Sequence, residues 1–393
     1  MVCAVVSDAS VTWLIARMGY GSSLLYWEPL LLGYCEHFPS TRVLTSENKT
    51  LVQKGAPAVE NAVTFRRLFS RKQKSSYPQS LILVNPRSII KVLRSPPNLL
   101  ILSEFGLLTI YGVFAGFLRR SMRILLLAES DPGRLAGVRT RRVRAWVRRF
   151  ICWRAARILT NNRAGEGYLI EELRVLPGKI SRGAYLVSCP GFASEAIPAK
   201  RSFPVAHSPD EYIAFLYVGR IIEGKGVSDL VAAAALLLPE VRRRIKVWVV
   251  GDGEQAAQLK MEIEAAGLQD TVCLFGAQPY QDLGLFYANA DVFVMPTHQD
   301  YRALVGFEAL AFGLPVIHSR GDGAADEVVD EGRNGFTFPP GDVHAISTYM
   351  RWFVENARRL SEFRKRSVEL SAQFSVAAAV DVLVHASTLA LAE

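Results

Sequence analysis

The sequence predicts an α/β protein of two domains, each built around a doubly wound parallel sheet, and three observations support this class. With 393 residues, the chain is longer than one ordinary domain. Short apolar runs alternate with longer helix-like stretches, which is the pattern of parallel strands covered by helices on both faces. The charge also divides the chain: residues 1–200 carry 29 Lys and Arg against 12 Asp and Glu, whereas residues 201–393 carry 17 against 25. Two parts of opposite net charge indicate two modules, and the basic one suggests an anionic partner.

The composition is that of a folded protein with reduced thiols. Half of the residues are apolar and 21% are charged, which excludes a disordered or fibrous chain. The five cysteines are scattered without a Cys-x-x-Cys pair, so neither a disulfide framework nor a zinc site is expected. We expect buried, reduced thiols in a cytoplasmic protein. The N-terminus lacks a basic segment followed by an apolar one, so no signal peptide is predicted.

The alternation of strands and helices is clearest in the second half. The predicted strands there are 212–218, 245–250, 271–275, 290–295 and 314–318. Helices such as 227–238 and 254–266 separate them. Ligands of such sheets bind beyond the carboxyl ends of the strands. We therefore expect one rim to be lined by the loops 219–226, 251–253, 276–279 and 296–303.

The first half alternates less regularly. Its candidate strands are 11–16, 42–45, 80–84, 99–102, 124–128 and 157–160. The apolar stretch 99–118 has twenty residues and could just span a bilayer. Glu104 interrupts it, however, so a strand followed by a helix over 105–118 is favoured, either buried or lying on a membrane surface.

These patterns divide the chain into four segments. Residues 1–200 form an N-terminal domain, and the proline-containing polar segment 201–211 is a linker. Residues 212–370 form a C-terminal domain. Residues 371–393 form a C-terminal helix, for which a return to the N-terminal domain is one option.

The first motif with chemical content is the loop 219–226, which contains Arg220 and Lys225 among glycines. It follows a strand and opens a helix. A helix N-terminus offers free N–H groups and partial positive charge, and two cations beside it make a site for a diphosphate. The alternative is that both side chains are solvated charges on an ordinary loop.

The second motif is a pair of carboxylates, Asp300 and Glu308. We expect Asp300 in a loop and Glu308 inside the helix that follows. A buried carboxylate needs hydrogen-bond donors, and the vicinal hydroxyls of a ribose or a hexose would supply them. The alternative is a structural salt bridge with a neighbouring arginine.

The second half of the chain contains the motifs Gly-Arg-x4-Lys-Gly at 219–226, Val-Gly-Asp-Gly at 250–253, Ala-Asp-Val-Phe-Val-Met-Pro at 290–296, acid-x7-Glu at 300–308, Gly-Leu-Pro-Val at 313–316 and Glu-Val-Val-Asp-x-Gly-x-Asn-Gly at 327–335. Their order and spacing resemble the donor-binding half of the family 4 glycosyltransferases, or glycosyl transferases group 1. Members of this family are retaining enzymes with the GT-B fold, in which two Rossmann-like domains face a central cleft. The resemblance is close over about 212–342 and weak over 80–200.

The resemblance implies a role for each matching residue. Arg220 and Lys225 would hold the donor diphosphate as the glycosidic bond breaks, an electrostatic role. Asp300 would contact the donor sugar, and Glu308 would accept hydrogen bonds from the ribose. The remaining implied donor-binding residues are Gly219, Gly251, Gly276, Gln278, Ala303, Leu304 and Glu327. The loop 276–278 would lie near the base, and Glu327 would lie behind the phosphates.

Several positions depart from the family pattern. Asp300 replaces the usual Glu and is one methylene shorter. Arg302 and Ala303 stand where an aromatic residue and a glycine are usual, so Ala303 would crowd the donor, and Arg302 could meet a phosphate or an acidic acceptor. The loop after 124–128 lacks the histidine of many members and offers Glu129 instead.

A second loop on the acceptor side contains Gly19 and Gly21. It would close over the phosphates, although a simple turn fits the same residues. No Asp-x-Asp motif occurs, so we expect no metal, and no cofactor beyond the nucleotide sugar as co-substrate.

The basic segment 134–157 contains nine arginines. Its apolar residues at helical spacing are Val143, Trp146, Val147, Phe150 and Trp153. A basic amphipathic helix with two tryptophans is typical of a helix on an anionic membrane surface. The alternative is packing of the apolar stripe into its own domain. Nucleic acid is not an expected partner, because no recognised binding motif is present.

Taken with these features, the resemblance to the family 4 glycosyltransferases implies a metal-independent retaining hexosyltransferase. It would move a sugar from a nucleotide-diphosphate sugar to a lipid-linked or saccharide acceptor in cell-surface polysaccharide biosynthesis. The expected location is cytoplasmic, peripheral at the inner face of the membrane. The alternatives are a sugar-nucleotide epimerase on the same fold and a non-catalytic membrane-associated scaffold.

Overall fold

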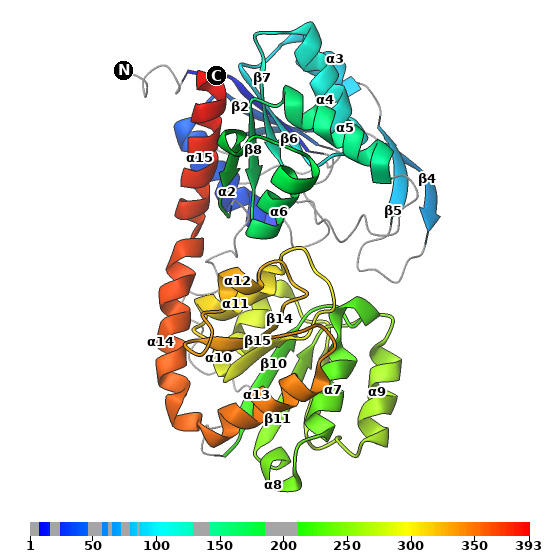
Figure 1. Ribbon diagram of the computed structural model, residues 1–393, viewed down its shortest axis with the longest axis vertical. Helices are drawn as coiled ribbons and strands as arrows, with labels where there is room; N and C mark the ends of the chain where they lie inside the picture. Colours follow the sequence, from blue (N-terminus) through cyan, green and yellow to red (C-terminus); the bar gives the residue numbers. More distant parts are fainter. Residues whose placement is uncertain are drawn as a thin grey trace. The chain divides into compact units, whose positions relative to one another are not determined.

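The computed structural model describes residues 8–15, 24–45, 57–61, 65–71, 79–84, 87–128, 141–184 and 211–393. These residues form two compact units (Figure 1). The first unit contains the described residues up to 184 together with Val376–Glu393. The second contains 211–375. Most of the predicted linker, 201–210, lies outside the described residues.

The first unit is built on a parallel sheet of seven strands in the order β3-β2-β1-β6-β7-β8-β9. The strands are β1 (Val11–Leu14), β2 (Thr41–Thr45), β3 (Ala58–Asn61), β6 (Leu99–Ser103), β7 (Arg123–Leu127), β8 (Arg157–Thr160) and β9 (Ile180–Arg182). The central strands are continuous apolar runs because helices bury both of their faces. Five of the six strands predicted for this half lie in this sheet.

The sixth predicted strand pairs differently. β5 (Gln79–Val84) runs antiparallel to β4 (Phe65–Arg71) in a separate two-stranded sheet. The expectation that 80–84 continues the parallel alternation is therefore wrong, because a short apolar run has the same pattern in either kind of sheet. The short edge strands β3 and β9 were not predicted.

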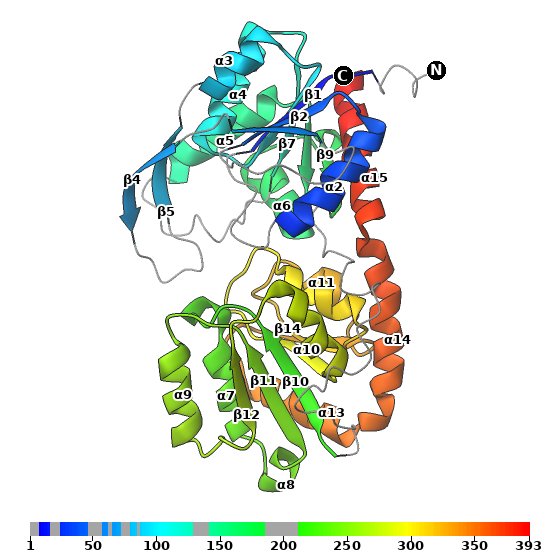
Figure 2. The same cartoon turned by 180° about the vertical axis from the view of Figure 1, so that it is seen from behind.

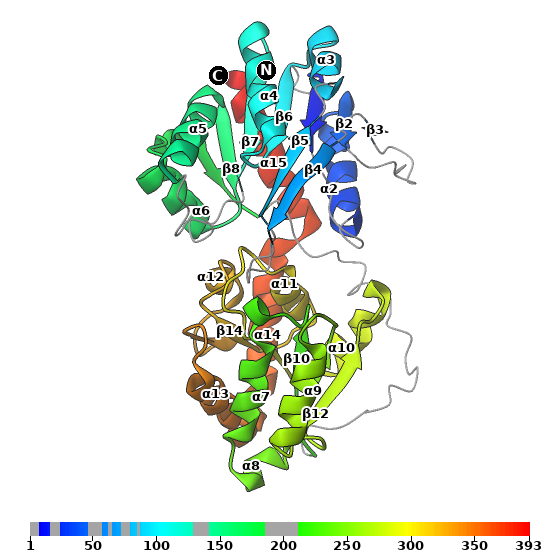
Figure 3. The ribbon, with the colours of Figure 1, turned by 90° about the vertical axis from the view of Figure 1, so that its right-hand side faces the viewer.

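Helices cover both faces of this sheet (Figures 1 and 3). The helical segments are α2 (Leu24–His37), α3 (Arg87–Arg94), α4 (Leu107–Leu118), α5 (Arg141–Arg154), α6 (Arg163–Gly167), η3 (Tyr168–Glu172), η4 (Pro177–Lys179) and α15 (Val376–Ala392). α3, α4 and α5 pack on one face, in a core that includes Leu102 and Ile124. The predicted division of 99–118 into a strand and a helix is confirmed by β6 and α4.

The C-terminal helix belongs to the first unit. α15 lies beside α2 (Figure 2), so close that a Cβ on Gly33 would stand 2.7 Å from Val380 Cγ2. The hydroxyls of Tyr34 and Ser387 are 2.8 Å apart in this contact. Among the described residues, one helical stretch, Ala357–Ala392, is long and apolar enough to cross a membrane, and its α15 part packs here against β7 and β8.

The second unit has a parallel sheet of six strands in the order β12-β11-β10-β13-β14-β15. The strands are β10 (Ile213–Val218), β11 (Ile245–Val250), β12 (Val272–Gly276), β13 (Val292–Met295), β14 (Val316–Ser319) and β15 (Gly335–Phe338). The first five are the predicted strands, and β15 was not predicted. The chain leaves β10 on one side for β11 and returns on the other side for β13, so the strand order reverses next to β10.

The helices of this unit form a layer on each face of the sheet. α7 (Val227–Ala235), α9 (Ala256–Ala265) and α13 (Val343–Glu355) pack on one face. α10 (Leu283–Asn289), α11 (Leu304–Ala311) and α14 (Leu360–Ser371) pack on the other. The shorter segments are η6 (Glu223–Lys225), α8 (Pro239–Arg242), η7 (Tyr280–Asp282), α12 (Ala325–Val328), η8 (Ala357–Arg359) and η9 (Ala372–Phe374).

The described cysteines are free thiols. Cys35 and Cys152 are buried, and Cys273 is half-buried. Burial raises the pKa of Cys35 to about 11 and that of Cys152 to about 12. These thiols are therefore poor nucleophiles at neutral pH. Cys3 and Cys189 lie outside the described residues.

Candidate functional site

The loops that follow β10, β11, β12 and β13 meet at one edge of the second unit. The Gly251 N–H donates to the Gly276 carbonyl at 2.8 Å, and the Ile221 N–H donates to the Asp252 carbonyl at 2.9 Å. The His298 N–H donates to the Gly224 carbonyl at 3.0 Å. The four loops predicted to line one rim are thus brought together, at the point where the strand order reverses.

Two glycines allow these loops to approach so closely. Gly226 has φ +64°, and a Cβ there would stand 2.1 Å from the Pro296 carbonyl oxygen. Gly251 has φ +148°, and a Cβ there would stand 1.8 Å from the Gly219 carbonyl oxygen. A side chain at either position would force the loops apart, so glycine is required at both.

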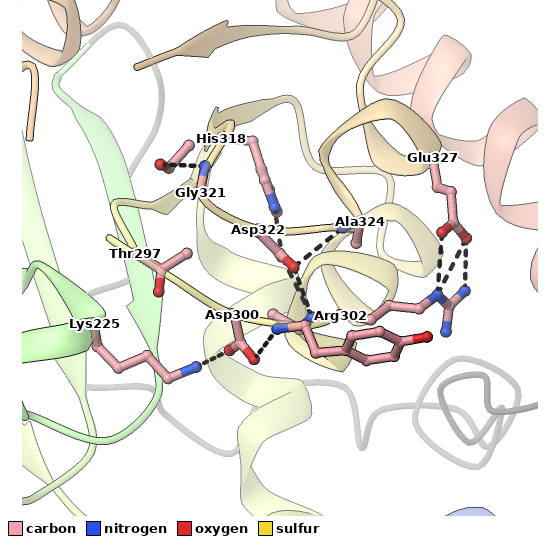
Figure 4. Close-up of polar contacts among 12 residues, drawn as sticks. Lys225, Thr297, Asp300, Arg302, His318, Gly321, Asp322, Ala324 and Glu327 are labelled. Atoms are coloured by element: carbon pink, nitrogen blue, oxygen red, sulfur yellow. Dashed lines mark hydrogen bonds and ion pairs between the residues drawn. The ribbon is translucent and has the colours of Figure 1, made fainter. Parts of the chain in front are cut away.

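Lys225 and Asp300 form an ion pair across this rim (Figure 4). Lys225 ends η6, directly before Gly226 and the N-terminus of α7, and Asp300 lies in the loop after β13. Their side chains are only 12% and 4% exposed. The other Asp300 oxygen, Oδ1, accepts the Tyr301 N–H at 2.8 Å. The structure therefore joins the predicted cation to the predicted sugar-binding carboxylate.

Arg220 lies on the same loop as Lys225 and is exposed. Its carbonyl accepts a hydrogen bond from the Tyr217 hydroxyl at 2.8 Å. Burial raises the pKa of Tyr217, and the negative charge of Asp300 raises it further, so the hydroxyl stays a donor. Tyr217 thus holds the main chain at Arg220 next to the ion pair.

Glu308 lies inside α11, as predicted, and is 2% exposed. Its donors are two tyrosines: the Tyr280 hydroxyl donates to Oε1 at 3.0 Å, and the Tyr287 hydroxyl donates to Oε2 at 2.7 Å. Neither tyrosine was identified from the sequence. The sequence indicated that a buried Glu308 needs hydrogen-bond donors, but it did not indicate which residues supply them.

Arg302 differs from the expectation that its charge faces a phosphate or an acidic acceptor. Its side chain is 2% exposed and pairs with Glu327, with Nη2 2.9 Å and Nε 3.2 Å from Oε2 (Figure 4). The guanidinium carbon also lies 3.9 Å from the ring centroid of Phe307. Arg302 thus stacks on an aromatic ring and ties its loop to α12, which contains Glu327.

Ala303 has an ordinary extended backbone, with φ −73° and ψ 114°. A glycine is therefore not needed for this conformation. The Ala303 N–H donates to the buried carboxylate of Asp322, at 3.1 Å from Oδ1. Asp322 and its neighbour His318 were not identified from the sequence. Leu304 follows Ala303 as the first residue of α11.

The other predicted site residues have less defined surroundings. Gln278 Nε2 donates to the Phe275 carbonyl at 2.7 Å, which orders the loop after β12. Gly276 has φ +69° and is exposed. Gly19, Gly21 and Glu129 lie outside the described residues. Within the described part of the chain, no cluster of three or more His, Cys, Asp or Glu could hold a metal ion.

The arrangement is suited to an anionic, polyhydroxylated ligand. A helix N-terminus with Lys225 beside it favours phosphate, because free N–H groups and positive charge point to the same place. The carboxylates of Asp300 and Glu308 can accept hydrogen bonds from sugar hydroxyls. Both kinds of group occur at the same edge of one sheet.

Part of the chain is similar to known glycosyltransferases. Residues 199–370 match the family model described as Glycosyl transferases group 1. D-inositol 3-phosphate glycosyltransferase 2 of Catenulispora acidiphila is 32% identical over 186 residues, 44% of this chain and 43% of that protein. The capsular polysaccharide biosynthesis glycosyltransferase CapM of Staphylococcus aureus is 33% identical over 131 residues, 33% of this chain and 34% of that protein. Each alignment therefore spans less than half of the relative's length.

The fold is shared over almost the whole chain. The crystal structure of Anabaena Alr3699/HepE in complex with UDP has a TM-score of 0.72 and 16% sequence identity, and the match covers 96% of this chain and 98% of that one. At this identity the likeness concerns the fold alone. The predicted GT-B fold is confirmed, and residues 199–370 are similar to the glycosyl transferases of group 1.

Proposed function

We propose that the protein is a retaining glycosyltransferase of family 4. It moves a hexosyl group from a nucleotide-diphosphate sugar to a lipid-linked or saccharide acceptor in cell-surface polysaccharide biosynthesis. The observation that carries the proposal is the Lys225–Asp300 ion pair at the N-terminus of α7, on the same rim as Glu308. HepE, which shares the fold, has been solved with UDP and with UDP-glucose.

Lys225 and Arg220 stabilise the leaving diphosphate in this proposal. The bond between the sugar C1 and the phosphate oxygen breaks, and the acceptor oxygen bonds to C1 on the same face. The acceptor proton passes to the leaving phosphate oxygen. Fixed cations and helix N–H groups stabilise the charge that develops there, so no enzyme nucleophile, metal or cofactor is needed.

Asp300 and Glu308 position the donor. Asp300 accepts from a hydroxyl of the transferred sugar, and Glu308 accepts from the ribose. Gly219, Gly251, Gly276 and Gln278 line the remainder of the donor site. The N-terminal domain binds the acceptor.

The acceptor side of the proposal includes an anionic membrane at the cytoplasmic face. On α5, Val143, Trp146 and Trp153 are 65%, 69% and 66% exposed. Their apolar surface continues onto α4, because the Phe117 ring, itself 40% exposed, stacks 6.1 Å from that of Trp153. Val147 and Phe150 are half-buried against the core, as the packing alternative expects, so α5 divides its apolar residues between the core and the surface. Exposed aromatic residues beside arginines are typical of a surface that enters an anionic bilayer.

The first experiment measures donor binding. Thermal-shift and calorimetric titrations with UDP-, GDP- and ADP-glucose identify the nucleotide, and a labelled donor then tests transfer to a lipid or saccharide acceptor in EDTA. We expect one nucleotide sugar to bind and the transferred sugar to keep its anomeric configuration. Glu308→Gln should weaken binding of that nucleotide, whereas the exposed Lys260→Ala on α9 is a matched control that should not.

Three outcomes would overturn the proposal. A nucleotide sugar that changes configuration without any acceptor would indicate an epimerase. Absence of binding to every nucleotide sugar, with lipid binding intact, would indicate a non-catalytic scaffold. Inversion at C1 in the product would contradict the retaining mechanism.

A further inference from the structure

The second unit buries a histidine and an aspartate next to each other. His318 lies in β14 and Asp322 four residues later, and both side chains are 0% exposed. His318 Nε2 is 2.9 Å from Asp322 Oδ2. Because an ionised carboxylate only accepts, Nε2 is the donor. His318 Nδ1 has no hydrogen-bond partner among the described residues. Burying such a pair costs more than burying an apolar one, so hydrophobic packing does not explain it.

Asp322 connects this pair to the loop that contains Asp300 (Figure 4). Its Oδ1 accepts the Ala303 N–H and the Ala324 N–H, each at 3.1 Å. Burial raises the pKa of the Asp322 carboxyl, but the donors from His318 and the two amides outweigh this effect and hold the pKa below its usual range. The carboxylate is therefore charged and fully engaged at neutral pH.

The main chains of the two loops are also joined. The Asp300 N–H donates to the Gly321 carbonyl at 2.9 Å, and the Gly323 N–H donates to the Asp300 carbonyl at 3.2 Å. Asp300 and Asp322 thus form an isolated parallel bridge. The Asp322 loop holds the 300–303 segment at both of its ends, at Asp300 through the main chain and at Ala303 through the carboxylate.

The imidazole also contacts the helix that contains Glu308. A Cβ on Gly306 of α11 would stand 3.1 Å from His318 Cε1, so the ring lies against the helix backbone at a position without a side chain. One buried pair therefore touches the segments that hold both predicted donor-binding carboxylates.

We propose that His318 and Asp322 are positioning residues, which fix the 300–303 loop so that Asp300 meets the donor sugar in its reactive orientation. This inference rests on the proposed function, because it takes Asp300 as the sugar contact. A small displacement of a group that orients the substrate can cost about a hundredfold in rate. Loss of the His318 donor leaves Asp322 free to turn, and the Ala303 amide follows it.

The test uses His318→Ala, His318→Gln and a control, Ser367→Ala. Ser367 is fully buried in the same unit and donates to the Leu314 carbonyl at 2.8 Å, away from the loop. In His318→Ala we expect kcat for transfer to fall about tenfold to a hundredfold, while the Kd of the nucleoside diphosphate without a sugar changes little. His318→Gln should recover part of the rate, since its side-chain amide can donate to Asp322.

Amide hydrogen exchange supplies a readout that does not depend on activity. Exchange within 300–304 should accelerate in His318→Ala and stay unchanged in Ser367→Ala. Unchanged exchange there, or an equal loss of kcat in the two variants at equal thermal stability, would overturn the proposal. If the wild-type protein transfers no sugar from any donor, the proposed function fails, and exchange alone decides whether the pair fixes the loop.

Discussion

The Lys225 ammonium and the Asp300 carboxylate are ion-paired although 75 residues separate them in the sequence. The pair joins the loop before α7 to the loop before α11. An ammonium has three N–H donors, so Lys225 can keep its bond to Asp300 while it donates to a phosphate oxygen. In the proposed reaction Lys225 contacts the phosphate and Asp300 contacts the sugar, and the ion pair holds each of these side chains in place.

Lys225→Ala should affect stability and transfer in different ways. It leaves the Asp300 carboxylate, which is 4% exposed, without its cation, at a cost of about 1–3 kcal/mol in the free energy of unfolding. Transfer should fall about a hundredfold or more, because a cation at the leaving phosphate is lost. Urea denaturation and a labelled-donor assay measure the two effects.

The double variant Lys225→Ala/Asp300→Asn separates pairing from catalysis. Removal of both charges should return most of the lost stability, since no buried carboxylate is left without the Lys225 cation, while transfer stays low. A double variant that is no more stable than Lys225→Ala alone would mean that the ion pair does not stabilise the fold.

Tyr280→Phe tests whether the Tyr280 hydroxyl and a nucleotide ribose compete for hydrogen bonds to the Glu308 carboxylate. Tyr280 is half-buried and donates to Oε1, so its loss should let a ribose hydroxyl bind that oxygen without competition from the Tyr280 hydroxyl. We expect the Kd of the nucleoside diphosphate to decrease about two- to fivefold, equivalent to part of one hydrogen bond. Isothermal titration calorimetry measures the change.

Tyr287→Phe is the matched variant at the other oxygen. Tyr287 is fully buried and holds Oε2 at 2.7 Å, so its loss should weaken nucleotide binding by misplacing the carboxylate. Equal weakening by the two substitutions would indicate that Tyr280 only orients Glu308 and does not compete with the ribose.

The sequence predicted those strands and helices that a local pattern of apolar residues marks. The strands β10 to β14 appear as apolar runs, and the rule that ligands bind at their carboxyl ends predicted which loops meet. Asp300 was expected before a helix and Glu308 inside it, and both positions are confirmed. The strand β15 was not predicted because it has only four residues, begins with Gly335 and does not contain a continuous run of β-branched or aliphatic residues.

The partners of the site residues could not be predicted in the same way. Tyr280 and Tyr287 lie 28 and 21 residues from Glu308. Tyr280 lies on η7 and Tyr287 on α10, and only the tertiary contact of these segments with α11 brings the two hydroxyls to the carboxylate. Arg302 was expected to face a ligand, but the position of Glu327 on α12 depends on how the intervening loop folds. Side-chain contacts between segments distant in sequence carry no local signal.

The loss of folding stability at acidic pH should depend on Asp322. Its pKa in the folded protein lies below the usual range, because donors from His318, Ala324 and Ala303 outweigh the effect of burial. In the unfolded chain this carboxyl has the ordinary Asp pKa of about 3.9, so on acidification the unfolded chain takes up the proton before the folded protein does. The stabilisation by Asp322 is therefore complete above about pH 3.9, and it is lost as the pH falls through the lower pKa of the folded protein. Asp322→Asn should be less stable at neutral pH and lose stability less steeply on acidification. Thermal unfolding between neutral and strongly acidic pH tests this, and parallel curves for the two proteins would contradict it.

The exposed tryptophans of α5 should control membrane binding. Burial of a large apolar side chain in the bilayer interface contributes about 1.5 kcal/mol or more, so Trp146→Ala and Trp153→Ala should each weaken vesicle partitioning roughly tenfold. Co-sedimentation with phosphatidylcholine vesicles, with and without phosphatidylglycerol, measures this, and binding should need the anionic lipid and weaken with salt.

Leu236→Ala/Leu238→Ala is the matched control, because these side chains are 49% and 56% exposed in the other unit and should have no effect. Equal losses in the tryptophan variants and this control would mean that lipid binding is not a property of α5.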